Sequence, residues 1–263
     1  LRSVSIPQCD VEQIDAFDAE QELVYYSAYD KSARSLNLYV ANMRGENKML
    51  SDSNTWAEAE FSANASYYML TQSAMNGLPV TTMHKSNGED LYGMVSNAKL
   101  EKEMEDFPQA SFFDFYTSDS TRLYGQIIKP TKFSKKKKYP VLLYTYGGPG
   151  YLVGTHNYSY TFNLWSKMLA QKGYVVVLVN PRGTDGRGEL FRKSSYGELG
   201  LIQLDDILET NKYLRQLKYI DPNRIGIYGW SFGGYLSSLA MTKGAGAFKM
   251  GIAVAPLVSW RFT

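Results

Sequence analysis

Four short, almost wholly apolar segments follow one another through the second half of the chain, with helical patterns between them. They span residues 139–146, 174–180, 224–228 and 250–255. Strands that are buried on both faces of a parallel sheet have this composition, and a helix between consecutive strands lets each strand run parallel to the one before it. The alternation therefore predicts a doubly wound, mostly parallel α/β sheet after residue 106.

The intervals between these strands have a helical period. The first interval places four apolar residues on one face, namely Phe162, Trp165, Met168 and Leu169. The second interval, near residues 198–217, does the same with Leu204, Ile207, Leu208 and Leu214. We expect both helices to cover the sheet with these faces, and residues 112–116 and 123–128 to form a hairpin ahead of it.

The first part of the chain has short aromatic or β-branched strands instead, separated by turn residues. A weak repeat with a constant offset of 44 residues relates Phe17, Tyr25 and Tyr39 to Phe61, Met69 and Met83. Such a period, with four strands per unit, is typical of β-propeller blades. A β-sandwich whose hairpins look alike by chance is the alternative. Two blades cannot close a propeller of about 4–8 blades, so we expect further blades before Leu1.

A glycine-rich motif stands between a predicted strand and a predicted helix. Residues 229–233 (GWSFG) fit the pattern G-x-S-x-G, and Gly234 follows them. In this arrangement the chain turns so sharply that the Ser231 hydroxyl projects above the sheet. Side chains at Gly229 and Gly233 would collide with the neighbouring strand and helix. The motif predicts the nucleophile elbow of an α/β hydrolase with Ser231 as nucleophile; an inert serine in a glycine-rich turn is the alternative.

These patterns divide the chain near residue 105. We expect residues 1–105 to be the C-terminal blades of an incomplete β-propeller. We expect residues 106–263 to be the N-terminal part of an α/β-hydrolase domain, with a doubly wound, mostly parallel sheet.

Tyr146 begins a second glycine-rich loop, YGGPG at residues 146–150, at the end of the strand two βα units before the elbow. The loop at this point of the fold contributes an oxyanion donor, commonly a backbone N–H. Pro149 has no N–H, but the hydroxyl of Tyr146 can donate a hydrogen bond instead. The alternative is that Tyr146 is a packed aromatic residue at a strand end, and its spacing does not decide between the two.

Composition argues against several classes of site. The formal charge is +2, which gives no reason to expect nucleic acid or an anionic membrane as a partner. Residues 135–138 are four lysines, and we interpret them as a solvated loop because no aromatic residue or arginine is interleaved with them. Cys9 is the only cysteine, so we expect no intrachain disulfide and no metal site. The only two histidines, His84 and His156, are interpreted as surface or loop residues.

Four motifs together resemble the dipeptidyl peptidase IV branch of the prolyl oligopeptidase superfamily. They are GWSFGGY at 229–235, YGGP at 146–149, RGTDGRG at 182–188 and IAVAP at 252–256. The resemblance implies a serine exopeptidase that removes N-terminal dipeptides, prefers proline or alanine at the second position, and works through an acyl-enzyme on Ser231. It implies a peptide as substrate and no cofactor, and it allows a homodimer of the complete protein. It also implies a periplasmic, secreted or membrane-anchored location, although the sequence itself leaves the compartment unknown.

The same resemblance assigns roles to individual residues. The backbone N–H of Phe232 and the hydroxyl of Tyr146 correspond to the oxyanion hole. Phe232, Leu257 and Trp260 correspond to positions that line the proline pocket. The family usually has tyrosine at the position of Phe232 and valine at that of Leu257, and both differences would change the pocket.

One part of the site departs from the pattern. In this fold the catalytic residues follow in the order Ser, then Asp or Glu, then His, yet the segment after Ser231 contains no Asp, Glu or His. We expect the Asp and His to lie after Thr263, and the glutamates that hold the substrate's N-terminus to lie before Leu1. The isolated chain should therefore be inactive, because a serine without its base is a poor nucleophile. An esterase-type hydrolase and a non-catalytic scaffold relative are the alternatives.

Overall fold

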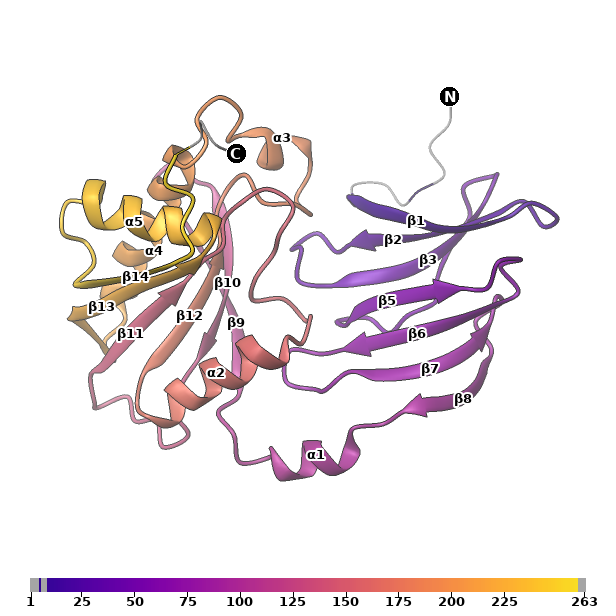
Figure 1. The fold of residues 1–263 in the computed structure, drawn as a ribbon, viewed down its shortest axis with the longest axis horizontal. Coiled ribbons are helices and arrows are strands. Elements are labelled where there is room, and N and C mark those ends of the chain that lie inside the picture. The colour runs from indigo at the N-terminus through magenta and orange to yellow at the C-terminus, as the bar shows by residue number, and fades with distance from the viewer. Residues whose placement is uncertain (1–4, 6–8, 260–263) are drawn as a thin grey trace. The chain divides into compact units, whose positions relative to one another are not determined.

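The chain forms two compact units (Figure 1). The computed structural model describes Ser5 and residues 9–259. The first unit contains Leu1–Glu105 together with two short segments from later in the chain, Thr155–Ser159 and Gly186–Gly188. The second unit contains Asp106–Gly154, Tyr160–Asp185 and Glu189–Thr263. No helix among the described residues has the length and apolar character needed to cross a membrane.

The first unit consists of two four-stranded antiparallel repeats. The first repeat contains β1 (Val11–Asp18), β2 (Leu23–Tyr29), β3 (Leu36–Asn42) and β4 (Asn47–Met49). The second contains β5 (Trp56–Phe61), β6 (Tyr67–Ser73), β7 (Val80–Lys85) and β8 (Asp90–Val95), and it is followed by α1 (Ala98–Glu103). Only the pair Leu36 and Trp56 joins β3 to β5. The predicted repeat is confirmed, because its offset carries β1, β2 and β3 onto β5, β6 and β7.

His84 lies inside this unit rather than on its surface, so its interpretation as a surface or loop residue was wrong. It is in β7 and is 6% exposed. Its ring stacks on Tyr68 with centroids 4.8 Å apart, its Nδ1 is 2.8 Å from Asp90, and its Nε2 is 2.6 Å from the Thr82 hydroxyl. An imidazole can be buried in this way because both ring nitrogens have polar neighbours.

The two late segments of the first unit are hydrogen-bonded to its strands and loops. His156 receives a bond on Nδ1 from the Met75 N–H (3.2 Å), and Ser73 accepts one from the Tyr158 N–H (3.1 Å). The Gly188 N–H donates to Asp10 over 2.6 Å. Burial lowers the pKa of His156. Nothing in the local pattern of residues 155–159 or 186–188 predicted these bonds.

The second unit is built on a six-stranded sheet in the order β14-β13-β11-β12-β10-β9. Its strands are β9 (Ala110–Tyr116), β10 (Arg122–Ile128), β11 (Tyr139–Tyr144), β12 (Val175–Asn180), β13 (Ile220–Trp230) and β14 (Met250–Val254). The four strands from β11 to β14 pair in parallel, whereas β9 and β10 form an antiparallel hairpin at one side. All six residues of β12 are buried, as expected for a strand covered on both faces.

The helices cover both faces of this sheet, as predicted. They are α2 (Tyr160–Gln171), the short α3 (Glu189–Lys193), α4 (Leu201–Gln216) and α5 (Phe232–Lys243). The chain steps from β11 to β12 in one direction and from β12 to β13 in the other, so right-handed crossovers place α2 and α4 on opposite faces. Accordingly α2 packs on β10 and β12, while α4 and α5 pack on β13 and on each other (Figure 1).

The buried face of α2 differs from the predicted one. Met168 is 40% exposed, whereas Ser166, Lys167 and Ala170 are buried. Lys167 is only 1% exposed, and burial lowers its pKa. A helical period shows that a helix has one apolar face, but tertiary packing decides how the helix is rotated about its axis and therefore which of its residues are buried. A lysine can occupy such a position because its aliphatic stem packs like an apolar side chain.

Candidate active site

Ser231 stands between the end of β13 and the start of α5, in a backbone conformation that non-glycine residues rarely adopt. Its φ is 53° and its ψ is −113°. Its N–H donates to the carbonyl of Val254 in β14 (2.9 Å), and its carbonyl accepts a bond from the Tyr235 N–H in α5 (3.0 Å). Strain of this kind costs on the order of 1–3 kcal/mol and persists only where the surroundings hold it. Here a strand and a helix hold Ser231 from both sides.

The glycines of the elbow leave room for this turn. A β-carbon on Gly229 would lie 2.1 Å from the carbonyl oxygen of Gly233, and one on Gly233 would lie 2.2 Å from the carbonyl oxygen of Thr145. One on Gly234 would lie 2.8 Å from the carbonyl oxygen of Val254. Each of these contacts is with backbone, which cannot rotate away. The elbow therefore requires glycine at these positions for steric reasons.

Ser231 is half-buried, while its two neighbours in sequence differ sharply. Trp230 is 53% exposed and Phe232 is 4% exposed. The Phe232 ring packs within the hydrophobic core of the second unit, in edge contact with Tyr235. Phe232 is also the first residue of α5, so its backbone N–H lies at the positive end of the helix dipole, next to Ser231.

Tyr146 lies beside the elbow. Its ring is half-buried between Tyr151 (centroids 4.7 Å apart) and Phe232 (6.3 Å). Within the described part of the chain the Tyr146 hydroxyl has no hydrogen-bond partner. The loop after it is closely packed, because a β-carbon on Gly147 would lie 2.5 Å from Leu236 and one on Gly148 would lie 2.9 Å from Phe232. The structure thus brings Tyr146, Ser231 and Phe232 together from two loops far apart in the sequence.

The two remaining pocket positions are described unequally. Leu257 is half-buried and packs against the core of the second unit, just after β14. Trp260 lies outside the described residues.

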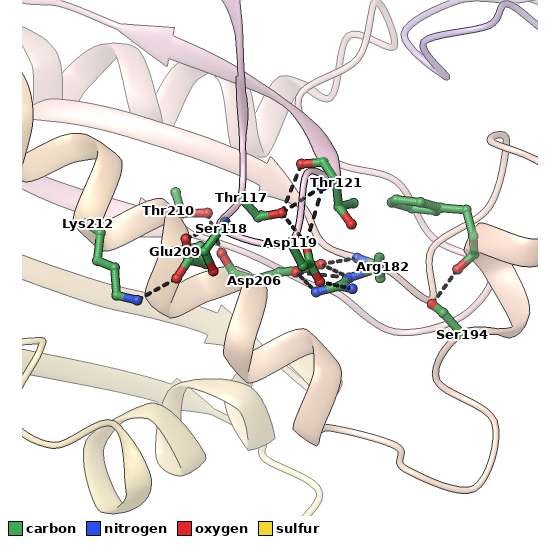
Figure 2. Close-up of polar contacts among 11 residues, drawn as sticks. Thr117, Ser118, Asp119, Thr121, Arg182, Ser194, Asp206, Glu209, Thr210 and Lys212 are labelled. Carbon is green, nitrogen blue, oxygen red and sulfur yellow. Dashed lines mark hydrogen bonds and ion pairs between the residues drawn. The ribbon is translucent and has the colours of Figure 1, made fainter.

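A buried ion pair supports the loop that follows β12, and the sequence patterns did not reveal it (Figure 2). The Arg182 guanidinium donates to both carboxylate oxygens of Asp206 in α4, with its shortest bond at 2.6 Å. The Arg182 backbone N–H also donates to Asp206 (2.7 Å). Asp206 is wholly buried, while Arg182 is 17% exposed. Burial raises the pKa of Asp206, and the bonds from Arg182 oppose this effect.

The same arginine reaches the turn between β9 and β10. Its Nη1 donates to Asp119 over 2.7 Å. The pKa of Asp119 is held well below its usual range, chiefly by the bond from the Thr117 hydroxyl and also by Arg182. Pro181, next to Arg182, lies 3.1 Å from where a β-carbon on Gly147 would stand. Arg182 therefore ties together the hairpin turn, α4 and the loop that packs against the Tyr146 loop.

One feature of the sequence could have revealed this ion pair. Asp206 falls on the helical stripe of α4 that contains Gln203, Ile207 and Thr210, all of which are buried. A carboxylate on a buried stripe needs a positively charged or hydrogen-bonding partner. The arginine of the RGTDGRG motif was a candidate partner, but only the fold shows that the two side chains meet.

The sequence after Ser231 contains no candidate for the general base of a serine hydrolase. Residues 232–263 contain no Asp, Glu or His. Both histidines of the chain, His84 and His156, belong to the first unit. Among the described residues, the candidate site therefore consists of the strained serine and the candidate oxyanion donors, and the sequence after Ser231 supplies no base.

Comparison with known proteins places both parts of the chain in one family. The model of the prolyl oligopeptidase family matches residues 160–263. The model of the dipeptidyl peptidase IV N-terminal region matches residues 3–78. The match of two models in this order agrees with the two units of the structure.

Individual relatives support the same assignment. A probable dipeptidyl peptidase 4 of Aspergillus flavus is 32% identical over 260 residues, which cover 96% of this chain and 34% of that protein. The prolyl endopeptidase FAP of Mus musculus is 36% identical over 209 residues, which cover 78% of this chain and 27% of that protein. The chain therefore spans about a third of the length of these relatives.

A solved structure is similar over the whole chain. The crystal structure of Porphyromonas gingivalis dipeptidyl peptidase 4 matches with a TM-score of 0.93 and 34% identity, covering 100% of this chain and 37% of that one. The blade repeats, the α/β-hydrolase unit and the sequence motifs agree with this likeness. The chain belongs to the dipeptidyl peptidase IV branch of the prolyl oligopeptidase family of serine peptidases.

Proposed function

We propose that the protein to which this chain belongs cleaves dipeptides from peptide N-termini through an acyl-enzyme on Ser231. The observation that carries this proposal is the strained backbone of Ser231, with a φ of 53°, at the junction of β13 and α5. Strain costs stability and is concentrated at functional sites. A serine without a role could relax, or be replaced by glycine at no steric cost.

The chemistry would proceed in two steps. The Ser231 oxygen attacks the scissile carbonyl carbon while a general base accepts its proton; the oxyanion collapses, and the peptide's amine leaves with that proton. Water then attacks the resulting ester and frees the dipeptide. The Tyr146 hydroxyl and the Phe232 N–H are the proposed donors to the oxyanion in both steps.

The preference for proline or alanine at the second position is proposed from the family alone. Leu257, Trp260 and Phe232 are the candidate pocket residues. The buried Phe232 ring lies next to the Tyr146 ring, so it would shape the pocket wall by packing. Relatives named dipeptidyl peptidase and prolyl endopeptidase both match this chain, so cleavage at a free N-terminus has to be tested directly.

A fluorophosphonate probe on the full-length protein tests the nucleophile. We expect labelling that Ser231→Ala abolishes, and faster hydrolysis of Gly-Pro-aminomethylcoumarin than of its N-blocked form. Ser237→Ala, which changes a buried serine on the same helix, serves as the matched control and should keep the labelling. A full-length protein that is folded but unlabelled would favour a scaffold. Labelling with turnover of simple esters alone would favour an esterase.

The chain 1–263 by itself provides a second test. It contains no Asp, Glu or His after Ser231, and a serine hydroxyl is weakly nucleophilic without a base. We expect it to hydrolyse Gly-Pro-aminomethylcoumarin at the background rate. Robust turnover by this chain, abolished by Ser231→Ala, would show that the base lies within residues 1–263 and would contradict the expected position of the triad.

A further inference from the structure

The formal charge of +2 is the sum of two parts of the chain whose net charges have opposite signs. Residues 1–105 contain 8 lysines and arginines against 16 acidic residues, whereas residues 106–263 contain 20 against 10. Charge asymmetry of this size between two parts of one chain indicates a surface that meets a charged partner. The total gives no sign of such a surface because the two halves cancel.

The positive charge of the second unit is concentrated at one edge of its sheet. The strands β11, β12, β13 and β14 are parallel, so the segments that lead into them meet at the same edge, which we call the amino edge. The four lysines 135–138 lead directly into β11. Five more exposed lysines lie at the ends of helices and loops on this edge: Lys132, Lys172, Lys218, Lys243 and Lys249.

Almost nothing neutralises these amines. In the described part of the chain none of the nine lysines forms an ion pair with a carboxylate. The segments 129–140, 171–175, 215–224 and 243–250 contain one acidic residue, Asp221, which is already bonded to Arg224 over 2.7 Å. Three further acidic residues, Glu103, Glu105 and Asp106, precede β9 in sequence, and none of them forms an ion pair with the nine lysines in the described part of the chain.

The loop that carries the four lysines is held at its base. The Ser134 N–H donates to the Tyr139 hydroxyl over 2.9 Å, and the Lys137 N–H donates to the Ser134 carbonyl. Phe133 packs against Tyr139 and Tyr219, with ring centroids 5.3 and 5.0 Å apart. Aromatic packing thus fixes the base of the turn, while all four lysine side chains remain exposed.

We propose that the amino edge, with Lys135–Lys138 at its centre, binds the headgroups of anionic phospholipids at a membrane surface. Lysines spread along the edge of a sheet can approach a flat, negatively charged membrane surface together. Such a surface attracts nearby positive charges and does not require them to converge on one point. Tyr174 is 38% exposed on the same edge, and tyrosine is favoured at headgroup depth. Nucleic-acid surfaces interleave arginines and stacking aromatics, which residues 135–138 lack. This binding is independent of catalysis at Ser231.

Vesicle sedimentation with the full chain tests the proposal. We expect binding to vesicles of phosphatidylcholine with 30% phosphatidylglycerol in low salt, and little binding to pure phosphatidylcholine or in 0.5 M salt, where the Debye length is below about 5 Å. Each lysine near an anionic bilayer raises partitioning by roughly fivefold. Replacing Lys135, Lys136, Lys137 and Lys138 together by glutamine should therefore lower the partition coefficient by on the order of several hundredfold.

The matched control replaces four exposed lysines of the first unit by glutamine, namely Lys31, Lys48, Lys99 and Lys102. It removes the same charge from elsewhere and should leave partitioning within about twofold of the original chain. Circular dichroism establishes that both variants fold. Equal losses in the two variants, absence of binding to the anionic vesicles, or tighter binding to duplex DNA of matched charge would each overturn the proposal.

Discussion

The two edges of the sheet in the second unit obey different physical constraints. At the edge where the parallel strands end, backbone approaches backbone so closely that Gly229 and Gly233 have no room for a β-carbon, and Ser231 is held in a strained conformation. At the amino edge, where the strands begin, nine lysines extend into solvent without an ion-pair partner among the described residues. One sheet thus joins an edge defined by close packing to an edge defined by charge.

The difference shows where this fold is sensitive to substitution. Close packing against backbone cannot adjust, so a single methyl group at the elbow should cost several kcal/mol. Exposed charges are screened by water and salt, so their removal should change binding and leave stability nearly unaltered. Four substitutions or conditions test this contrast, from the largest expected effect to the smallest.

Gly233→Ala should give the largest loss of stability. Its β-carbon would lie 2.2 Å from the carbonyl oxygen of Thr145, so β11 and α5 would have to separate. We expect the free energy of unfolding, measured by urea denaturation, to fall by about 3 kcal/mol or more. Gly93→Ala is the matched control, because nothing lies within 4 Å of its β-carbon position. Similar midpoints for Gly233→Ala and Gly93→Ala would contradict the steric explanation.

Arg182→Met should come next. It removes the guanidinium from the wholly buried Asp206 and leaves only the backbone N–H of residue 182 as a donor from that position, and breaking a buried ion pair by removing one charge costs about 3 kcal/mol. The double variant with Asp206→Leu should recover most of the loss, since no buried charge remains. Arg122→Met, at an exposed arginine bonded to Asp114, should cost less than about 1 kcal/mol. A double variant as unstable as the single one would show that the burial of Asp206 is not the cause.

Ser231→Gly should stabilise the chain. Glycine adopts a φ of 53° without the penalty that serine bears, so we expect a gain of about 1 kcal/mol in the free energy of unfolding. The same variant removes the nucleophile, so stability and fluorophosphonate labelling should change in opposite directions. Ser238→Gly, within α5, should instead destabilise. A loss of stability in Ser231→Gly would mean that the elbow is not strained.

Lowering the pH should have the smallest effect on the free energy of unfolding, through the protonation of Asp119. Its pKa is lowered in the folded state, first by the Thr117 hydroxyl, so the folded chain favours the carboxylate. Its contribution is present above the unfolded pKa of about 3.9 and is lost as the pH falls below it. Because Asp119 is 52% exposed, the contribution should stay below about 1 kcal/mol. The stability gap between the original chain and Asp119→Asn should therefore be larger at pH 7 than at pH 3; an equal gap would contradict this account.

Much of the fold follows from local patterns. The offset that relates Phe17 to Phe61 predicted the two four-stranded repeats of the first unit, and the apolar runs predicted the parallel strands of the second. The elbow could be predicted because its glycines, its serine and the flanking strand and helix are contiguous. The buried face of α2 could not be predicted in the same way. Its period allowed Met168 to be buried, whereas tertiary packing buries Lys167 and leaves Met168 exposed.

Periodicity and contiguous motifs were enough to specify which segments are strands, where Ser231 stands and why glycine surrounds it, because those properties depend on neighbours in the chain. The fold alone brought Asp206 to Arg182 and the lysines of separate loops to one edge, whereas the approach of Tyr146 to Phe232 was expected only from the family resemblance. These meetings depend on strand order and crossover direction, which arise from packing over long sequence separations and leave no periodic trace in the residues concerned.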